Sequence, residues 1–120
     1  MKEEASEWLE QAEEDFETAE FLVDSGKTEQ GGFFLQQAAE KALKAMLLEK
    51  DGDYPYEHNL VKLAKDLDVP DEYIDVFPVL NSLYVGSRYP DQHTSDIQNL
   101  EQIKSKVEEF LEWMKRQLEE

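Results

Sequence analysis

Cysteine is absent from this chain of 120 residues, so neither a disulfide framework nor a thiolate metal site can form. Long apolar runs are missing as well, and the longest fall far short of the roughly 20 residues that a membrane-spanning helix needs. The N-terminus lacks the basic and apolar segments of a signal peptide. We therefore expect a soluble, cytoplasmic protein that is not attached to a membrane.

Positive charge is scarce. Lysine and arginine number 12 against 29 aspartates and glutamates, which gives a net charge of −17. Ten of the acids lie between Glu3 and Asp24. Such a field repels nucleic acid, which is bound by Lys and Arg neutralising phosphates, so any nucleic-acid site must be local and small. A solvated acidic surface is the favoured interpretation, and a docking face for a basic partner is the alternative.

The length fits a single domain, residues 1–120, and nothing in the chain resembles a linker between two domains. Apolar residues make up 40% of the chain, which is enough to build a core. A domain of this size buries a modest fraction of its surface, and a second subunit would add to it. We therefore expect one domain that gains stability from self-association.

Apolar residues recur at three- and four-residue steps almost throughout, which is the period of amphipathic helices. The first predicted helix covers residues 5–24 and ends just before Gly26, which suits a C-terminal cap. The second covers residues 33–48, and its start is ambiguous because Gly31 and Gly32 disfavour a helix interior. Its many alanines allow close approach of neighbouring helices, so we expect it to be the central element.

A short third helix is predicted over Leu60–Leu67. A fourth begins at Asp71, where an acid suits the positive end of the helix dipole. Pro78 lies inside this fourth helix and should kink it, because proline lacks an N–H and collides with the preceding turn. Gly86 and Pro90 then bracket a break in the chain.

The last helix is predicted to start near Ser95, which with Gln98 can form a capping box. No segment alternates between apolar and polar residues as a half-buried strand does. The sequence therefore predicts an all-α bundle of five helices joined by short connections.

Few segments could carry chemistry. The two histidines, His58 and His93, are too few for a His-rich metal site within one chain. Carboxylates without a specific spacing are weak evidence for a metal. The pair Gly31-Gly32 lacks the pattern of a phosphate-binding loop, and no serine stands in a recognisable nucleophile setting. We expect neither a metal ion nor a cofactor.

The segment Arg88-Tyr89-Pro90-Asp91-Gln92-His93 is the one local cluster whose side chains suggest a catalytic site. Arginine offers a rigid fork for phosphate, and histidine exchanges a proton near neutral pH. Together they can cleave RNA without metal, since a base can activate the 2′-hydroxyl while a cation stabilises the charge that develops on phosphate. In the alternative interpretation, Arg88 pairs with one of the many acids and His93 simply lies in a loop.

Four segments, in this order along the chain, resemble the HEPN family: Glu14–Ala19, Phe34–Ala45, His58–Leu60 and Tyr84–Asp91. The second and fourth, the latter with its Arg-Tyr-Pro-Asp, are the most specific. The resemblance implies an up-down bundle of four to five helices, usually a homodimer, and a role of toxin–antitoxin or nucleotide-binding type.

Many HEPN proteins are ribonucleases with an arginine followed four to six residues later by a histidine, and two copies of this motif meet across the dimer. Arg88 and His93 match that spacing. The sequence departs from the pattern at Tyr89, where active members have a small polar residue. It departs again at Ser95, where toxins of one branch carry a tyrosine that a partner nucleotidyltransferase modifies. The resemblance thus implies catalytic Arg88 and His93, with Tyr89 and Asp91 beside them in an RNA or nucleotide site.

Other residues have competing interpretations. Glu40, Lys41 and Lys44 lie in the most family-like stretch and could face the dimer cleft, but a salt-bridge ladder along the helix would also explain them. We favour the ladder for Lys41 and leave Glu40 and Lys44 open as binding residues. His58 precedes a helix and is interpreted as a capping or packing residue. Tyr89 could stack on a base or simply be packed.

Three hypotheses of different classes follow. The first is a metal-independent endoribonuclease of toxin type that uses Arg88 and His93. The second is a nucleotide-binding module without catalysis. The third is a helical dimer that binds a small nucleotidyltransferase-type antitoxin.

Overall fold

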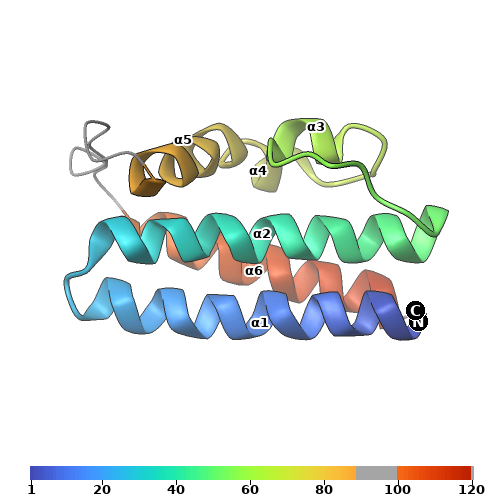
Figure 1. Cartoon of the computed structure of the whole chain (residues 1–120), viewed down its shortest axis with the longest axis horizontal. Helices are drawn as coiled ribbons and strands as arrows, with labels where there is room; N and C mark the ends of the chain where they lie inside the picture. The colour runs from blue at the N-terminus through green and yellow to red at the C-terminus, as the bar shows by residue number, and fades with distance from the viewer. Residues whose placement is uncertain (89–99, 120) are drawn as a thin grey trace.

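The computed structural model describes residues 1–88 and 100–119, with side chains from 1 to 84 and from 100 to 119. These residues form six helices and no strand: α1 Glu3–Asp24, α2 Thr28–Asp51, α3 Leu60–Ala64, α4 Asp71–Ile74, α5 Phe77–Arg88 and α6 Leu100–Glu119. Helices α1, α2, α5 and α6 run alternately up and down, and both termini lie at one end (Figure 1). The predicted all-α, up-down bundle is confirmed.

The hairpin between α1 and α2 is closed by a glycine cap, as predicted. Gly26 has φ 83°, in the left-handed region that glycine adopts without strain. The amide of Lys27 donates to the carbonyl of Leu22 at 2.8 Å, and that of Gly26 to Val23 at 3.1 Å. These bonds satisfy carbonyls that the end of α1 leaves unpaired.

Helix α2 starts at Thr28, so Gly31 and Gly32 lie inside it, and the ambiguous start is resolved. Both glycines allow close packing against neighbours. A Cβ at Gly31 would lie 2.6 Å from Cγ2 of Val23 in α1, and one at Gly32 would lie 3.1 Å from Cδ2 of Leu83 in α5. The absence of side chains at these two positions therefore sets how closely α1 and α5 approach α2.

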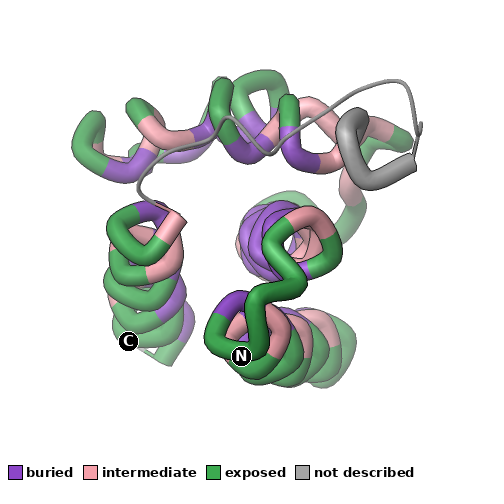
Figure 2. The backbone as a smooth tube through the Cα atoms, turned by 90° about the vertical axis from the view of Figure 1, so that its left-hand side faces the viewer, coloured by how far each residue is buried: buried purple, intermediate pink, exposed green. Residues whose placement is uncertain are grey.

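Helix α2 is the central element, as the alanine pattern indicates. It packs against α1, α3, α5 and α6, and its tube in Figure 2 is mostly purple, the colour of buried residues. Ala38, Ala39, Ala42 and Ala45 are completely buried. Helix α6 buries the apolar face that its period predicts: Ile103, Val107, Phe110, Leu111, Met114 and Leu118.

The predicted fourth helix is wrong in its bounds. Instead of one helix kinked at Pro78, the structure has two, α4 and α5, with Pro78 as the second residue of α5. The reason is physical: the amides of a helix's first turn have no partner within the helix, so a proline there loses no hydrogen bond. Helix α5 continues through Gly86 to Arg88, within the predicted break between Gly86 and Pro90, and the rest of that break lies outside the described residues.

Two smaller points concern helix ends. The third helix ends at Ala64 rather than at Leu67, and a turn follows in which the Leu67 amide donates to the Ala64 carbonyl at 3.0 Å. The predicted capping box of Ser95 and Gln98 lies outside the described residues.

Within the described part of the chain, no helix has the length and apolar character needed to cross a membrane.

Candidate functional site

The predicted catalytic segment is described only where it begins. Arg88 is the last residue of α5, and its side chain, together with Tyr89, Asp91 and His93, lies outside the described residues. Tyr84 precedes Arg88 by four positions, so the two positions fall on one face of α5, about one turn apart. The surroundings of Tyr84 therefore show what stands next to the start of this segment.

Tyr84 stacks on His58. Their ring centroids are 5.3 Å apart with an angle of 18° between the planes. His58 comes from the loop before α3, and its Nδ1 lies 3.2 Å from both carboxylate oxygens of Glu40 in α2. The end of α5 and the middle of α2 thus meet through one imidazole.

Glu40 and Lys44 contact each other along α2, as the ladder interpretation requires. Lys44 Nζ lies 3.0 Å from Glu40 Oε2, one helical turn away. The Glu40 side chain is only 6% exposed and the Lys44 side chain 7%. A salt-bridge ladder on a helix surface is, by contrast, solvated. Lys41 does not join a ladder within the helix: it pairs with Asp15 of α1 at 2.7 Å.

Gln36 completes the surroundings of Glu40. Its Nε2 donates to Glu40 Oε1 at 3.0 Å and to the carbonyl of His58 at 3.2 Å. Its own Oε1 accepts from Gln37 Nε2 at 2.7 Å. We call Gln36, Glu40, Lys44 and His58 the Glu40 cluster. Three of its members are buried, and His58, with its side chain 39% exposed, is the member that reaches solvent.

Aromatic rings surround the cation of this cluster. Lys44 Nζ lies 5.2 Å from the ring centroid of Tyr54 and 5.9 Å from that of Trp8. Trp8 and Tyr54 pack edge to face at 5.2 Å. Cation–π contact and the Glu40 carboxylate together stabilise a charge that has lost most of its water.

The loop that carries His58 is held by hydrogen bonds on both sides. Asn59, rather than His58, caps α3: its Oδ1 accepts from the amides of Val61 at 3.0 Å and Lys62 at 3.4 Å. Asn81 of α5 donates to the same oxygen at 3.0 Å. The capping interpretation of His58 is therefore wrong, whereas its packing interpretation is confirmed by the stack on Tyr84.

Glu57 anchors the other side of the loop. The Asn59 amide donates to its carboxylate at 3.1 Å, and this bond lowers the pKa of Glu57 below its ordinary 4.5. Partial burial opposes the shift, while the His58 amide, at 3.0 Å, and the charges of Lys62 and His58 add to it. The ionised form of Glu57 is thus the one that keeps the loop in place.

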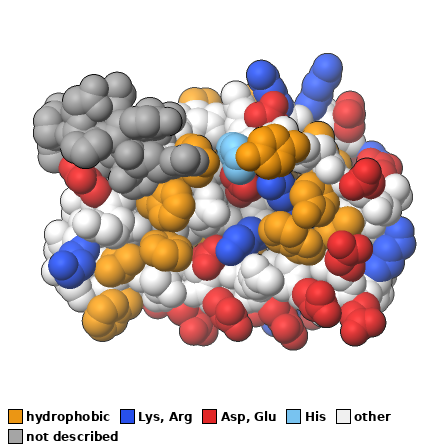
Figure 3. All heavy atoms as spheres, in the orientation of Figure 1, with side chains coloured by type: hydrophobic (Ala, Val, Ile, Leu, Met, Phe, Trp, Pro, Cys, Tyr) orange, Lys and Arg blue, Asp and Glu red, His pale blue; other side chains and the backbone are white. Residues whose placement is uncertain are grey.

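Figure 3 shows one histidine on this face of the molecule, in pale blue. It is His58, since His93 lies outside the described residues. Hydrophobic side chains flank it, basic and acidic groups lie beneath it, and acidic side chains follow the edge formed by α1. Among the described residues, no three acidic or histidine side chains are grouped so as to hold a metal ion.

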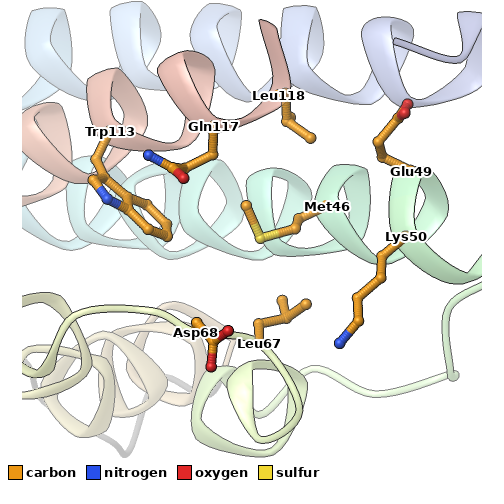
Figure 4. A pocket seen from close by; sticks show the side chains of 8 residues that line it. All are labelled: Met46, Glu49, Lys50, Leu67, Asp68, Trp113, Gln117 and Leu118. Atoms are coloured by element: carbon orange, nitrogen blue, oxygen red, sulfur yellow. The ribbon is translucent and has the colours of Figure 1, made fainter. Parts of the chain in front are cut away.

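A cavity of about 290 Å³ lies elsewhere, between α2, α6 and the turn that follows α3 (Figure 4). Its walls include Met46, Leu67 and Trp113, and Lys50 on its rim donates to the carbonyl of Asp66 at 2.7 Å. This cavity holds no group of the Glu40 cluster, and its polar side chains form no comparable network.

Sequence reasoning named Glu40 and Lys44 but missed Gln36, Tyr84, Tyr54 and the contact of His58 with Glu40. A polar residue recurring at Gln36, Glu40 and Lys44, on one face of an otherwise alanine-rich helix, was the available signal. The sequence spacing of Gln36, Glu40 and Lys44 does not predict that this face of α2 contacts the loop that carries His58.

Comparisons with known proteins agree with this architecture. The HEPN domain model matches residues 5–117. The structure of TT1696 from Thermus thermophilus is similar, with a TM-score of 0.84 and 29% identity over 96% of this chain and 98% of that one. The archaeal HEPN homologue ST0689 gives a TM-score of 0.73 and 29% identity over 98% and 99% of the two chains. No curated protein matches. This chain belongs to the HEPN family.

Proposed function

We propose that this HEPN protein is a metal-independent endoribonuclease of toxin–antitoxin type, with Arg88 and His93 as its catalytic residues. The observation that carries the proposal is that Arg88 ends α5 one turn beyond Tyr84, whose ring stacks on His58 of the Glu40 cluster. In a chain with a net charge of −17, phosphate can approach only where cations are concentrated locally. Arg88 supplies such a cationic position at the end of α5, and a second copy would supply another across a dimer.

The reaction needs no metal. A base accepts the proton of a 2′-hydroxyl, the oxygen attacks the adjacent phosphate, and Arg88 stabilises the charge on the phosphate oxygens. Tyr89 and Asp91 contribute to holding the RNA, and the buried Glu40–Lys44 pair supports the surface around His58 rather than contacting the RNA. The family pattern, in which two copies of the motif meet across a dimer, supports a homodimer as the active form, and the proposed antitoxin is a small nucleotidyltransferase-type protein.

The surface agrees with self-association. Phe21 is 70% exposed, and Phe33 and Phe34 are half-buried, so large aromatic groups remain available for a second subunit. Sedimentation at micromolar concentration should give twice the 14.0 kDa mass of one chain. A compact monomer at high micromolar concentration would exclude the composite site.

The two arginines of the chain provide a matched test. Arg116 lies exposed in the last turn of α6. Purified protein is incubated with mixed RNA in EDTA, as wild type, Arg88→Ala and Arg116→Ala. We expect Arg88→Ala to lose RNA binding and cleavage with an unchanged melting temperature, and Arg116→Ala to behave as wild type.

If Arg88 instead pairs with a buried acid, its loss should lower the free energy of unfolding by about 3–5 kcal/mol. A large drop in melting temperature, with no anion binding by the wild type, would contradict the ribonuclease proposal. His93→Ala should retain RNA binding and lose cleavage by about a hundred- to ten-thousand-fold, the usual effect of removing a general acid or base.

A nucleotide-binding role without catalysis is the second candidate, favoured by a row of rings. Phe33 stacks on Tyr84 at 5.8 Å, Tyr84 on His58 at 5.3 Å, and Tyr56 meets His58 edge-on at 5.3 Å. Tyr56 is 93% exposed, so a base could stack at that end of the row. RNA or nucleotide binding by the wild type without any cleavage in the experiment above would favour this candidate.

A further inference from the structure

The cavity between α2, α6 and the turn that follows α3 has no part in the proposed RNA cleavage. Its volume of about 290 Å³ lies at the lower end of the range for ligand pockets, about 300–1,000 Å³, so it suits a small molecule. Every side chain that lines it belongs to the described residues. The chemistry of these walls therefore indicates which kind of molecule would bind.

The middle of the cavity is apolar. Met46 of α2, Leu67 of the turn and Leu118 of α6 lie between its two ends in Figure 4. Trp113 forms the wall at one end, and its half-buried indole packs on Tyr73 and on Phe110, with ring centroids 6.0 and 6.3 Å apart. A ligand with alkyl groups would remove apolar surface from water on both sides of the contact.

The charged side chains of the wall are Glu49, Lys50 and Asp68, and α6 contributes none. Glu49 accepts from a backbone amide at 2.6 Å, and Lys50 donates to a backbone carbonyl at 2.7 Å. Both lie at the end away from Trp113 in Figure 4, whereas Asp68 lies on the side of Trp113. Among the described residues, the Asp68 carboxylate has no ion-pair or hydrogen-bond partner. The Trp113 end of the cavity therefore offers an aromatic ring and an unpaired anion.

This combination selects a cation. The indole ring attracts a positive charge through its quadrupole, and tryptophan does so best among the aromatic side chains. The net charge of −17 concentrates cations around the molecule and repels anions. The apolar middle of the cavity adds that the cation carries alkyl groups.

We propose that this cavity binds a small alkylammonium cation. The nitrogen lies against the Trp113 ring and faces Asp68, and the alkyl groups cover Met46, Leu67 and Leu118. This site goes beyond the proposed RNA cleavage and does not depend on it.

The test uses three molecules of nearly the same shape and different charge. Choline is positive, 3,3-dimethylbutan-1-ol is neutral and 3,3-dimethylbutanoate is negative. Each is added to the full chain at constant ionic strength, and the indole N–H signal of Trp113 is followed by NMR. Trp8, the second tryptophan of the chain, packs against Tyr54 outside the cavity, so its signal is an internal control.

Choline should shift the Trp113 signal to saturation and leave that of Trp8 unchanged. The neutral alcohol should bind about tenfold more weakly, because it lacks the attraction to the ring and to the carboxylate. The carboxylate probe should cause no shift. Raising the salt concentration should weaken choline binding, since ions screen its attraction to the protein.

Two matched variants locate the charge that matters. Asp68→Asn and Asp75→Asn change the net charge equally and replace exposed side chains, but only Asp68 lines the cavity. Asp68→Asn should weaken choline binding by about fivefold, the upper range for an exposed ion pair, and Asp75→Asn should stay within about twofold of wild type. Melting temperatures of both variants should match that of wild type, which separates binding from folding.

Three results would overturn the site. The first is no saturating shift of Trp113 with choline up to about 100 mM, a concentration that would detect affinities down to about 4 kcal/mol below the 1 mM range or better. The second is equal binding of choline and of the neutral alcohol, which would mean an apolar hollow without preference for charge. The third is equal weakening by Asp68→Asn and Asp75→Asn, which would assign the attraction to the overall charge. None of these measurements involves RNA, so their failure and that of the ribonuclease proposal are distinguishable.

Discussion

The imidazole of His58 and the carboxylate of Glu40 face each other in the fold although 18 positions separate them in the chain, and Nδ1 lies 3.2 Å from each carboxylate oxygen. One residue comes from a loop and the other from the buried face of α2. Their contact joins the helix that organises the core to the end of the helix that carries Arg88. The stability of α2 and the geometry of the proposed site therefore depend on the same carboxylate.

Glu40→Gln should destabilise the fold strongly. The change leaves Lys44, 7% exposed, without its anionic partner, and breaking such a buried pair lowers the free energy of unfolding by about 3–5 kcal/mol. The control is Glu13→Gln, whose pair with Lys115 spans 3.9 Å between side chains 44% and 52% exposed, and which should change stability by less than about 1 kcal/mol. Urea unfolding measures both. Equal effects of the two variants would contradict the buried pair.

Gly31→Ala should destabilise the α1–α2 hairpin, although alanine favours a helix by about 1 kcal/mol over glycine. The new methyl would lie 2.6 Å from Cγ2 and 3.1 Å from the backbone nitrogen of Val23. Overpacking of this kind lowers the free energy of unfolding by about 1–3 kcal/mol. Gln30→Ala, at an exposed position in the same turn, is the control and should stay within about 0.5 kcal/mol of wild type. A stabilised Gly31→Ala would show that the helices can separate without penalty.

The long helices could be predicted from the sequence because a period of 3.6 residues depends on local spacing alone. Most of the predicted apolar face of α1 is buried, as the pattern indicates: Ala5, Leu9, Ala12, Phe16, Ala19 and Val23. Pro78 misled the prediction because proline is a helix breaker by average propensity. In the structure, Pro78 occupies a first turn, where its missing N–H has no consequence.

The site could be predicted only in part. Glu40 and Lys44 are four apart on one helix, so their contact is a local property. The partners from other elements depend on how the loop of His58 and helix α5 pack on α2, which no periodicity encodes. A histidine before a helix is interpreted by habit as a cap, yet Asn59 is the cap here, and that leaves the His58 ring available to Glu40.

Acid should release the loop that carries His58. The folded state lowers the pKa of Glu57 below 4.5, so Glu57 contributes stability above that pH and loses its contribution as pH falls through its folded pKa. NMR titration of the Glu57 carboxyl should give a pKa below 4.5, with the amide signals of His58 and Asn59 moving at the same pH. In Glu57→Gln the two amide signals should no longer titrate together. An unshifted Glu57 would mean that its hydrogen bonds do not hold the loop.

Salt should stabilise the protein. Seventeen net negative charges repel one another in the compact state, and ions screen that repulsion. Some acids are already paired locally: Lys104 lies within 4.0 Å of Glu101, Asp24 and Glu20. The remaining excess is large, so the melting temperature should rise as salt increases from about 20 mM to about 200 mM, where the screening length falls below about 10 Å. A flat or falling curve would indicate that local pairing already balances the acids.

The chemistry of the RNA ends tests the account's central claim most directly. Wild-type protein and a 5′-labelled single-stranded RNA are incubated in EDTA, and the fragments are analysed by mass spectrometry. Cleavage by the 2′-hydroxyl predicts fragments with 2′,3′-cyclic phosphate and 5′-hydroxyl ends, and none from RNA in which every 2′-hydroxyl is methylated. Intact RNA after prolonged incubation, or fragments with 5′-phosphate ends, would contradict the account.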